Sequence, residues 1–192
     1  MHKIILIGGG GHCESVIDVI EAEARFEIYG IIDIESKVGK EILGYKIIGT
    51  DKDLEKIRED ISYAFVTVGH IYSNQDRKNL FRLLRKLDFK IPAIFSPRAY
   101  VSKHSKINPG TVVMHNAVIN ASAIIGSDCI INTNAVVEHG ANIGNNCHIS
   151  TSVTINGNTK IGNNCFIGSN STTKECIEIS DNTFIKAGAI VK

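Results

Sequence analysis

Residues 131–156 read INTNAVVEHGANIGNNCHISTSVTIN, and an aliphatic residue stands at every sixth position of this stretch. The same period runs from Val101 to Val191, and only Thr173 interrupts the aliphatic series. A small residue, often alanine or cysteine, comes four positions after most members of the series, and turn-forming triplets such as GNN lie between them. A helix of 3.6 residues per turn cannot keep a period of six, whereas short strands joined by tight corners can. The repeat therefore predicts a parallel β-helix.

The period also predicts the size of one coil. If a coil has three flat faces of six residues each, residues 18 apart lie directly above one another, and successive coils are about 4.8 Å apart. Cys129, Cys147 and Cys165 are spaced by 18, which makes them one inward stack. We interpret these three cysteines as packing residues.

The first 95 residues follow a different pattern. Short apolar runs such as KIILIGG (3–9) and SYAFVTVG (62–69) alternate with amphipathic segments such as NQDRKNLFRLLRKLD (74–88), whose arginines and lysines lie opposite its leucines. Strands that alternate with helices predict a small parallel sheet built from βαβ units. We therefore expect a Rossmann-like α/β domain over residues 1–96 and a β-helix over residues 97–192.

Composition excludes several classes of partner. The chain has 192 residues and a formal net charge of +1, so neither nucleic acid nor an anionic membrane surface is indicated. No apolar run approaches the roughly 20 residues that a membrane-spanning helix needs. Five cysteines stand in no metal-binding or redox spacing, which is typical of a reducing compartment. We expect a cytoplasmic protein.

Four motifs carry a resemblance to a known family: GGGGH at 8–12, IID at 31–33, INTNAVVEHGANIG at 131–144 and HISTSVTING at 148–157. With them the chain resembles the hexapeptide-repeat sugar acyltransferases, in particular the NeuD-type sialic acid O-acetyltransferases and the PglD-type amino-sugar N-acetyltransferases. The combination of INT, EHG, IST and NG resembles the NeuD type more closely. The resemblance implies a left-handed β-helix, acetyl-CoA as cosubstrate, a homotrimer and a role in bacterial surface-glycan biosynthesis.

The resemblance also implies roles for individual residues. His139, the histidine of the EH pair, would be the general base, with Asn132 as a further catalytic residue and His148 and Gly157 as acetyl-CoA contacts. Gly140 departs from the PglD type, which often has an acidic residue after the catalytic histidine, and this departure weakens an amino-sugar assignment. The chain stops at AGAIVK, so we expect none of the CoA contacts that a further tail makes in relatives.

The chemistry of the Glu138–His139 corner agrees with these roles. Both residues follow the inward Val137 and should face outward. An imidazole ordinarily titrates near pH 6.5, so it can remove a proton from an attacking hydroxyl or amine, an effect of roughly 10²–10⁴-fold. A neighbouring carboxylate, here Glu138, can stabilise the imidazolium or set its tautomer. The alternative is a corner histidine that is merely solvated.

The coil length places two more residues relative to His139. Because 139 plus 18 is 157, Gly157 should lie over His139 in the next coil, with its backbone N–H free to act on the thioester oxygen. His148 is nine residues away, half a coil, and so lies on another side of the prism. The two histidines share a site only where subunits pack edge to edge, which predicts a trimer with sites between subunits. Alternatively, His148 is an ordinary surface residue and Asn132 a corner residue in an αL conformation.

The glycine loop after the first strand suggests an anion site, because free N–H groups at the start of a helix attract negative charge. The dinucleotide fingerprint is not met, since Cys13 stands where the third glycine is required, and NAD binding is not expected. By resemblance this domain holds the acceptor. Its expected contacts are Gly10, Gly11, His12, Asp33 and Gly69. The alternative is that the glycines only make a tight strand–helix turn.

These observations predict an acetyl-CoA-dependent sugar acetyltransferase with direct transfer and no metal. The acceptor is the hydroxyl of sialic acid or a related nonulosonic acid, or instead the 4-amino group of a UDP-linked amino-deoxysugar. Gly140 and ISTSVTING favour the first, and the glycine loop favours the second. Two other classes remain as alternatives: a non-catalytic β-helix that serves as a binding or scaffold protein, and a zinc-dependent carbonic anhydrase. The latter needs three histidines at metal distance, and His139 and His148 supply two.

Overall fold

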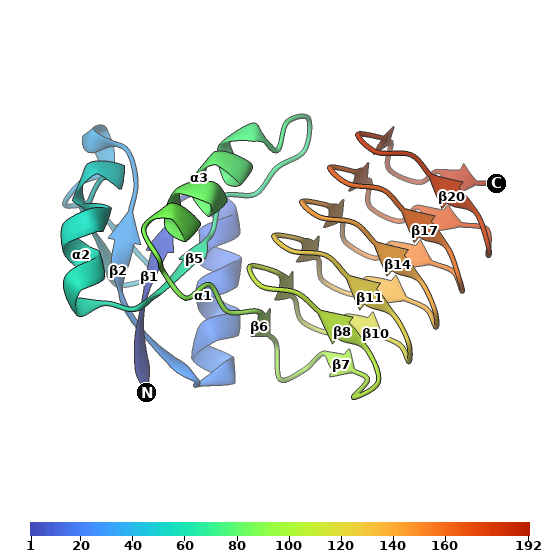
Figure 1. The fold of residues 1–192 in the computed structure, drawn as a ribbon, viewed down its shortest axis with the longest axis horizontal. Helices are drawn as coiled ribbons and strands as arrows, with labels where there is room; N and C mark the ends of the chain where they lie inside the picture. Colours follow the sequence, from blue (N-terminus) through green and yellow to red (C-terminus); the bar gives the residue numbers. More distant parts are fainter. The chain divides into compact units, whose positions relative to one another are not determined.

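Two units, Met1–Pro92 and Ala93–Lys192, make up the computed structural model, which describes residues 1–192 (Figure 1). Strands and helices alternate in the first unit, as the sequence predicts. Its elements are β1 (His2–Ile7), α1 (Gly11–Glu23), β2 (Phe26–Ile32), the 3₁₀ turn η1 (Glu35–Lys37), β3 (Glu41–Ile42), β4 (Tyr45–Gly49), the 3₁₀ turn η2 (Asp51–Asp53), α2 (Leu54–Asp60), β5 (Tyr63–Val66) and α3 (Gln75–Lys86).

A five-stranded sheet in the order β3-β4-β2-β1-β5 forms the centre of the first unit. All its pairs are parallel except the hairpin of β3 and β4. The chain steps from β1 to β2 and β4 on one side, and then returns to β5 on the other side of β1. Sheets of this kind bind ligands outside the carboxyl ends of their strands, at the point where the strand order reverses. That point lies here at the ends of β1 and β5, after Ile7 and Val66.

The sheet is buried on both faces, because every residue from Ile4 to Ile7 in the central strand β1 is buried. Ile5 and Ile7 pack in one apolar cluster with Phe81 and Leu84 of α3. The amphipathic pattern of α3 produces this contact, since residues three apart lie on the same face of a helix. None of the protein's helices is long and apolar enough to cross a membrane.

Each strand of the second unit has two residues. The strands are β6 (Ile94–Phe95), β7 (Tyr100–Val101), β8 (Lys106–Ile107), β9 (Val112–Val113), β10 (Val118–Ile119), β11 (Ile124–Ile125), β12 (Ile130–Ile131), β13 (Val136–Val137), β14 (Asn142–Ile143), β15 (His148–Ile149), β16 (Thr154–Ile155), β17 (Lys160–Ile161), β18 (Phe166–Ile167), β19 (Thr172–Thr173), β20 (Glu178–Ile179), β21 (Phe184–Ile185) and β22 (Ile190–Val191).

These strands form three parallel sheets, in the orders β22-β19-β16-β13-β10-β7, β20-β17-β14-β11-β8 and β21-β18-β15-β12-β9-β6. Paired residues are 18 apart, as in Val118 with Val136 and Ile119 with Val137. Figure 1 shows the resulting stack of coils, coloured from green at the first coil to red at the last. The predicted parallel β-helix with 18 residues per coil is confirmed.

The corners of the β-helix are made by residues in the left-handed αL conformation, which recur every six positions from Gly110 to Gly188. Asparagine occupies half of these positions, for example Asn116 with a φ of 58° and Asn164 with a φ of 59°. Glycine and asparagine adopt this conformation at the lowest cost. The turn-forming triplets of the sequence therefore determine where the chain bends.

The aliphatic series and its small companions fill the interior. Thr173, the exception in the series, is only 1% exposed, and its hydroxyl accepts a hydrogen bond of 3.0 Å from the backbone N–H of Asn156. Cys129, Cys147 and Cys165 are completely buried. The thiols of the other two cysteines, together with burial, raise the pKa of Cys147. The cysteines are packing residues, as predicted.

The β-helix begins with β6, which pairs with β9. Phe95 extends the six-residue series by one position below Val101, with an aromatic ring in place of an aliphatic side chain. The two units therefore divide after Pro92, slightly before the boundary between residues 96 and 97 that the aliphatic series suggests.

Candidate functional site

The candidate catalytic corner lies between β13 and β14. Val137 at the end of β13 is completely buried, whereas Glu138 is half-buried and His139 is exposed. Gly140 turns the chain with a φ of 67°, and a Cβ at this position would collide with the side-chain amide of Asn158. A side chain at position 140 would therefore be strained.

The imidazole of His139 lies directly against Gly157 of the next coil. A Cβ at Gly157 would stand 2.9 Å from both Cε1 and Nε2 of the ring. Gly157 does not have a positive φ, so the close approach of the ring, rather than the backbone conformation, requires glycine here. The backbone N–H of Gly157 donates to no other group of the protein. The structure thus brings together the two residues that the spacing of 18 connects.

Glu138 is held by the coil below rather than by the imidazole. Its Oε2 accepts a hydrogen bond of 2.9 Å from Nδ2 of Asn120 and a longer one of 3.4 Å from the backbone N–H of His139. No hydrogen bond joins the Glu138 carboxylate to the His139 ring. Any influence of Glu138 on the imidazole of this corner is therefore electrostatic.

Asn132 and His148 form a second pair. Nδ2 of Asn132 lies 3.1 Å from Nε2 of His148, and Oδ1 of Asn132 accepts a hydrogen bond of 2.8 Å from the Thr133 N–H. Because the amide oxygen faces the backbone, the amide nitrogen must donate to Nε2, which leaves the proton of a neutral His148 on Nδ1. His148 is only 8% exposed and packs edge-on against Phe166 with ring centroids 5.2 Å apart. It is therefore more enclosed than an ordinary surface histidine.

The predicted residues of the β-helix thus fall into two groups within one chain. Glu138, His139 and Gly157 follow β13 and β16 of one sheet, whereas Asn132 and His148 lie at β12 and β15 of another. This is the arrangement that the half-coil separation of the two histidines predicts.

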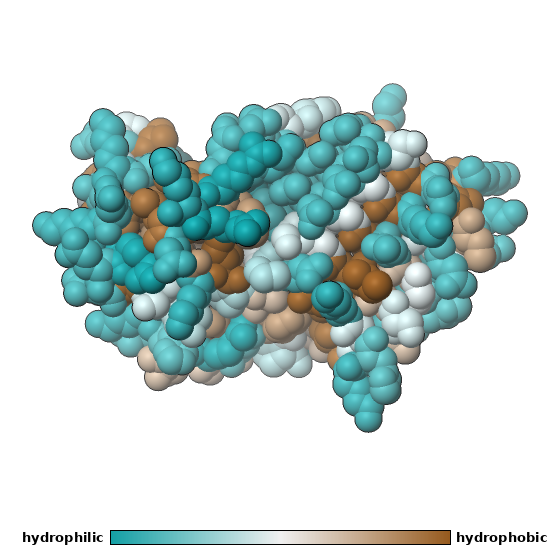
Figure 2. Space-filling model, viewed as in Figure 1, coloured by the Kyte–Doolittle hydropathy of each residue, from teal (hydrophilic) through white to brown (hydrophobic).

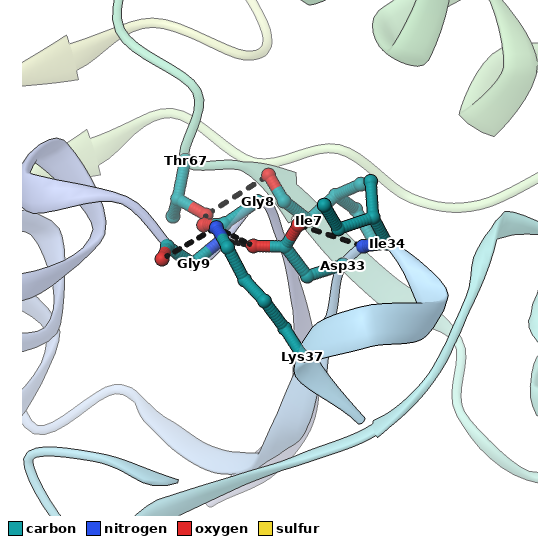
Figure 3. A network of polar contacts seen from close by, with 7 residues as sticks. All are labelled: Ile7, Gly8, Gly9, Asp33, Ile34, Lys37 and Thr67. Atoms are coloured by element: carbon teal, nitrogen blue, oxygen red, sulfur yellow. Dashed lines mark hydrogen bonds and ion pairs between the residues drawn. The ribbon is translucent and has the colours of Figure 1, made fainter. Parts of the chain in front are cut away.

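The glycine loop of the first unit is locked by Asp33 and Lys37 (Figure 3). Oδ2 of Asp33 accepts hydrogen bonds from the Gly9 N–H at 2.7 Å and from Nζ of Lys37 at 2.9 Å, while Oδ1 accepts from the Ile34 N–H at 2.7 Å. Lys37 also donates to the carbonyl of Gly9 at 3.3 Å. Asp33 thus holds the loop and also lines a pocket of this unit, and its expected contact with the acceptor stays a prediction.

These contacts decide the charge of Asp33, whose side chain is 10% exposed. Partial burial acts to raise the pKa of this carboxyl, but the hydrogen bonds from Lys37 and from the Ile34 and Gly9 N–H groups outweigh it and hold the pKa below its usual value. Asp33 is therefore ionised at neutral pH and fixes the loop through charge-assisted hydrogen bonds.

Gly10 and Gly11 mark the start of α1, and no side chain caps this helix. A Cβ at either glycine would meet nothing within 4 Å, so the space above the helix start is open. Gly69 lies against His12, since a Cβ at Gly69 would stand 3.2 Å from Cβ of His12. Cys13 is completely buried, and burial raises the pKa of its thiol to about 11, so it is a packing residue.

A pocket of about 610 Å³ opens at the carboxyl ends of the strands in the first unit. This volume lies in the range of small-molecule sites. Its walls combine apolar side chains with carboxylates; the lining residues are Ile7, Gly8, Ile32, Asp33, Ile34, Glu35, Thr50, Asp51, Lys52, Val68, Asp76, Asn79 and Leu80. The pocket is at the point where the strand order reverses, as the topology requires.

Three further residues support these sites and were not singled out from the sequence. Thr67 donates from its hydroxyl to the carbonyls of Ile7 and Gly8, at 2.9 and 2.5 Å. Arg77 of α3 is 1% exposed, and its Nη1 donates to the Val66 and Val68 carbonyls at 2.9 and 2.8 Å. The expectation that the cations of this helix all lie opposite the apolar face is therefore wrong for Arg77.

Asn120 is the third residue that was not singled out. Of the three, only Asn120 could have been found from the sequence, because it stands 18 residues, one coil, before Glu138. Neither Thr67 nor Arg77 has such a signal, since their partners are distant and follow no period.

Family models match both halves of the chain. The PglD N-terminal domain matches residues 3–84, the hexapeptide repeat of succinyl-transferase matches residues 122–156, and the bacterial transferase hexapeptide (six repeats) matches residues 140–175 and 158–192. No curated protein matches the sequence.

A solved structure of perosamine N-acetyltransferase from Caulobacter crescentus, a histidine-to-asparagine mutant in complex with CoA and GDP-perosamine, has a TM-score of 0.93 to this chain. The two are 30% identical, and the match covers 100% of this chain and 89% of that chain. The chain belongs to the PglD-type hexapeptide-repeat sugar acyltransferases.

A second relative supports the same family. The acetyltransferase domain of PglB from Neisseria gonorrhoeae has a TM-score of 0.91 and 29% identity, over 100% of this chain and 92% of that chain. Its complex with acetyl-CoA has a TM-score of 0.89 and 27% identity, over 99% and 92%. This PglD-type acyltransferase is thus an acetyl-CoA-dependent sugar acetyltransferase, with a Rossmann-like α/β domain and a left-handed parallel β-helix. It contains no group of three or more His, Cys, Asp or Glu side chains that could hold a metal ion.

Proposed function

We propose that this acyltransferase transfers the acetyl group of acetyl-CoA to the amino group of a sugar that is linked to a nucleoside diphosphate. The observation that carries the proposal is the pocket of about 610 Å³ at the carboxyl ends of β1 and β5. Its lining includes Gly8, the first glycine of the loop that leads to α1. No side chain caps the start of this helix, and N–H groups at a helix start suit a phosphate. A sugar linked to a nucleoside diphosphate uses both features, because its nucleoside and sugar fill a pocket and its phosphates bind at a helix start. The GDP-perosamine held by the Caulobacter relative is an acceptor of this class.

In this proposal His139 is the general base. Its exposed imidazole takes a proton from the acceptor amine as the nitrogen attacks the thioester carbon. The N–C bond forms, the C–S bond breaks, and the proton passes to the departing thiolate of CoA. The free N–H of Gly157 stabilises the charge that develops on the thioester oxygen. Glu138 stabilises the imidazolium through its charge, without a direct hydrogen bond.

The proposed assembly is a homotrimer with the active site between subunits. The separation of the His139 group from the Asn132–His148 pair supports it, because residues on two sides of one prism meet only across a subunit boundary. Large apolar side chains also reach the surface of the β-helix, and Figure 2 shows hydrophobic patches among hydrophilic ones. The exposed ones include Tyr100, Ile124, Phe184 and Ile190. We place the reaction in the cytoplasm, where acetyl-CoA is available, within a surface-glycan pathway.

The test is CoA release from acetyl-CoA with a panel of acceptors: UDP- and GDP-linked amino-deoxysugars, CMP-sialic acid and free sialic acid. We expect one nucleoside diphosphate-linked amino sugar to give the highest rate. His139→Ala should lose about 10²–10⁴-fold in kcat/KM, because the proton then has no acceptor in place. His104→Ala, which removes another exposed corner histidine of the β-helix, should keep the full rate. Equal rates for the wild type and His139→Ala would show that His139 is not the general base.

O-acetylation of sialic acid is the second candidate, and Gly140 is the observation that favours it. A preference for sialic acid over all nucleoside diphosphate-linked sugars in the same panel would select it, and the role of His139 would be unchanged.

A further inference from the structure

Asn120 occupies the position directly below Glu138 in the β-helix. It follows β10 as Glu138 follows β13, and the two strands pair with a register of 18, so the residues stack. Asn156 stands above Glu138 at the same position of the next coil, but its Nδ2 donates at 2.7 Å to the Thr173 carbonyl further along. Of the two asparagines that flank Glu138, only Asn120 bonds to it.

Every polar group of Asn120 has a partner. Its backbone N–H donates to the Val137 carbonyl at 2.9 Å, and its Oδ1 accepts from the Ala121 N–H at 2.8 Å. The oxygen of the amide is thereby turned toward the backbone, and Nδ2 faces Oε2 of Glu138 at 2.9 Å. The orientation of the amide is therefore dictated by the backbone of its own corner.

A neutral amide has a specific consequence for Glu138. An arginine or lysine at this position would also hold the carboxylate, but it would cancel much of the negative charge close to His139. No salt bridge to Glu138 is present. The amide fixes the direction of the carboxylate and leaves its charge intact beside the His139 backbone.

We infer that Asn120 is a positioning residue of the acetyl transfer: it holds the Glu138 carboxylate beside His139 without neutralising it. The inference rests on the proposed function of the Glu138–His139 corner. Without Asn120 the carboxylate would rotate toward solvent, and the imidazolium formed in the reaction would lose part of its stabilisation.

A double-mutant cycle tests this inference with the full-length protein, acetyl-CoA and the best acceptor of the panel. Asn120→Ala should lower kcat about tenfold, with the KM for acetyl-CoA within about twofold of wild type. Glu138→Gln should show a similar loss. The double variant should be no slower than Glu138→Gln alone, because Asn120 acts only through that carboxylate.

Two further variants separate positioning from structure. Asn120→Asp keeps the size of the side chain but turns a second carboxylate toward Glu138, so it should lose at least as much as Asn120→Ala. Asn145→Ala removes a comparable bond between coils, from Nδ2 to the Asn163 amide at 3.0 Å, at a corner away from His139. It should keep wild-type kinetics.

Several results would overturn the inference. These are a wild-type kcat in Asn120→Ala or Asn120→Asp, a full rate in Glu138→Gln, or a double variant that loses a further factor of about ten. If His139→Ala is inactive in these cases, the proposed base stands and only the role of Asn120 is wrong. If His139→Ala is fully active, both fail together.

Discussion

The two units of the protein bring residues together by different rules. In the β-helix the paired strand residues of neighbouring coils are 18 apart, and so are His139 with Gly157 and Asn120 with Glu138. In the α/β unit the contacts that hold the glycine loop join residues 24 apart for Gly9 with Asp33, and about 60 apart for Ile7 with Thr67. In a repeat protein each unit contacts only its neighbours, so these contacts can be predicted from the period of the sequence. In a wound sheet the sequence separation of two contacting residues differs from one pair to the next.

The largest expected effect is a loss of stability on removing a contact of the α/β unit that no sequence period predicts. Arg77→Met removes the Nη1 donor to the Val66 and Val68 carbonyls, and this side chain is 1% exposed. Because hydrogen bonds from a buried cation are lost, we expect the first unit to lose about 3 kcal/mol of unfolding free energy. Urea denaturation would measure it, with the β-helix as internal reference. Exposed Arg82→Met on the same helix is the control and should change little; equal stability of the two variants would contradict the prediction.

The next effect tests the periodic contacts of the β-helix. Gly157→Ala places a Cβ 2.9 Å from the His139 ring and pushes the imidazole out of position. A displacement of this size should cost about 10²-fold in kcat, while the melting temperature changes little. Gly188→Ala strains a corner with a φ of 70° but meets nothing within 4 Å, and because this corner lies more than two coils beyond His139 the variant should keep the full rate. Full activity in Gly157→Ala would show that contact at a spacing of 18 does not imply a shared role.

The smallest expected effect is on acceptor binding, and it concerns the glycine loop of the α/β unit that Asp33 and Lys37 hold. Asp33→Asn replaces the carboxylate that binds Lys37 and two backbone N–H groups, so the loop should loosen. We expect the KM for the acceptor to rise about tenfold while kcat at saturation is kept. Exposed Asp60→Asn is the control. A changed kcat with an unchanged acceptor KM would place Asp33 outside the acceptor site.

The same variant should alter the response to acid. The pKa of Asp33 is lower in the folded protein than in the unfolded chain, so its stabilising effect is complete above the unfolded value of about 3.9. It is lost as the pH falls through the folded value. The first unit of the wild type should therefore lose stability below about pH 4 more steeply than Asp33→Asn, which circular dichroism against pH would measure.

The sequence by itself determined the β-helix, the outward Glu138–His139 corner, the burial of the three stacked cysteines and the position of Gly157 over His139. A strict period makes this possible, because the coil length converts a position in the chain into a position in space. The same period of 18 also predicts that Asn120 lies next to Glu138 in the neighbouring coil.

Only the tertiary structure decided the rest. The bonds from Asp33 to Gly9 and Lys37, which hold the glycine loop, follow from no period in the chain. Arg77 belongs by its pattern to the polar face of a helix, and the fold buries it at the carboxyl end of β5. The reason is physical: in a wound sheet the partners of a side chain come from elements joined by crossovers of differing length. The partner of a given residue is therefore fixed by packing, and no spacing along the chain encodes it.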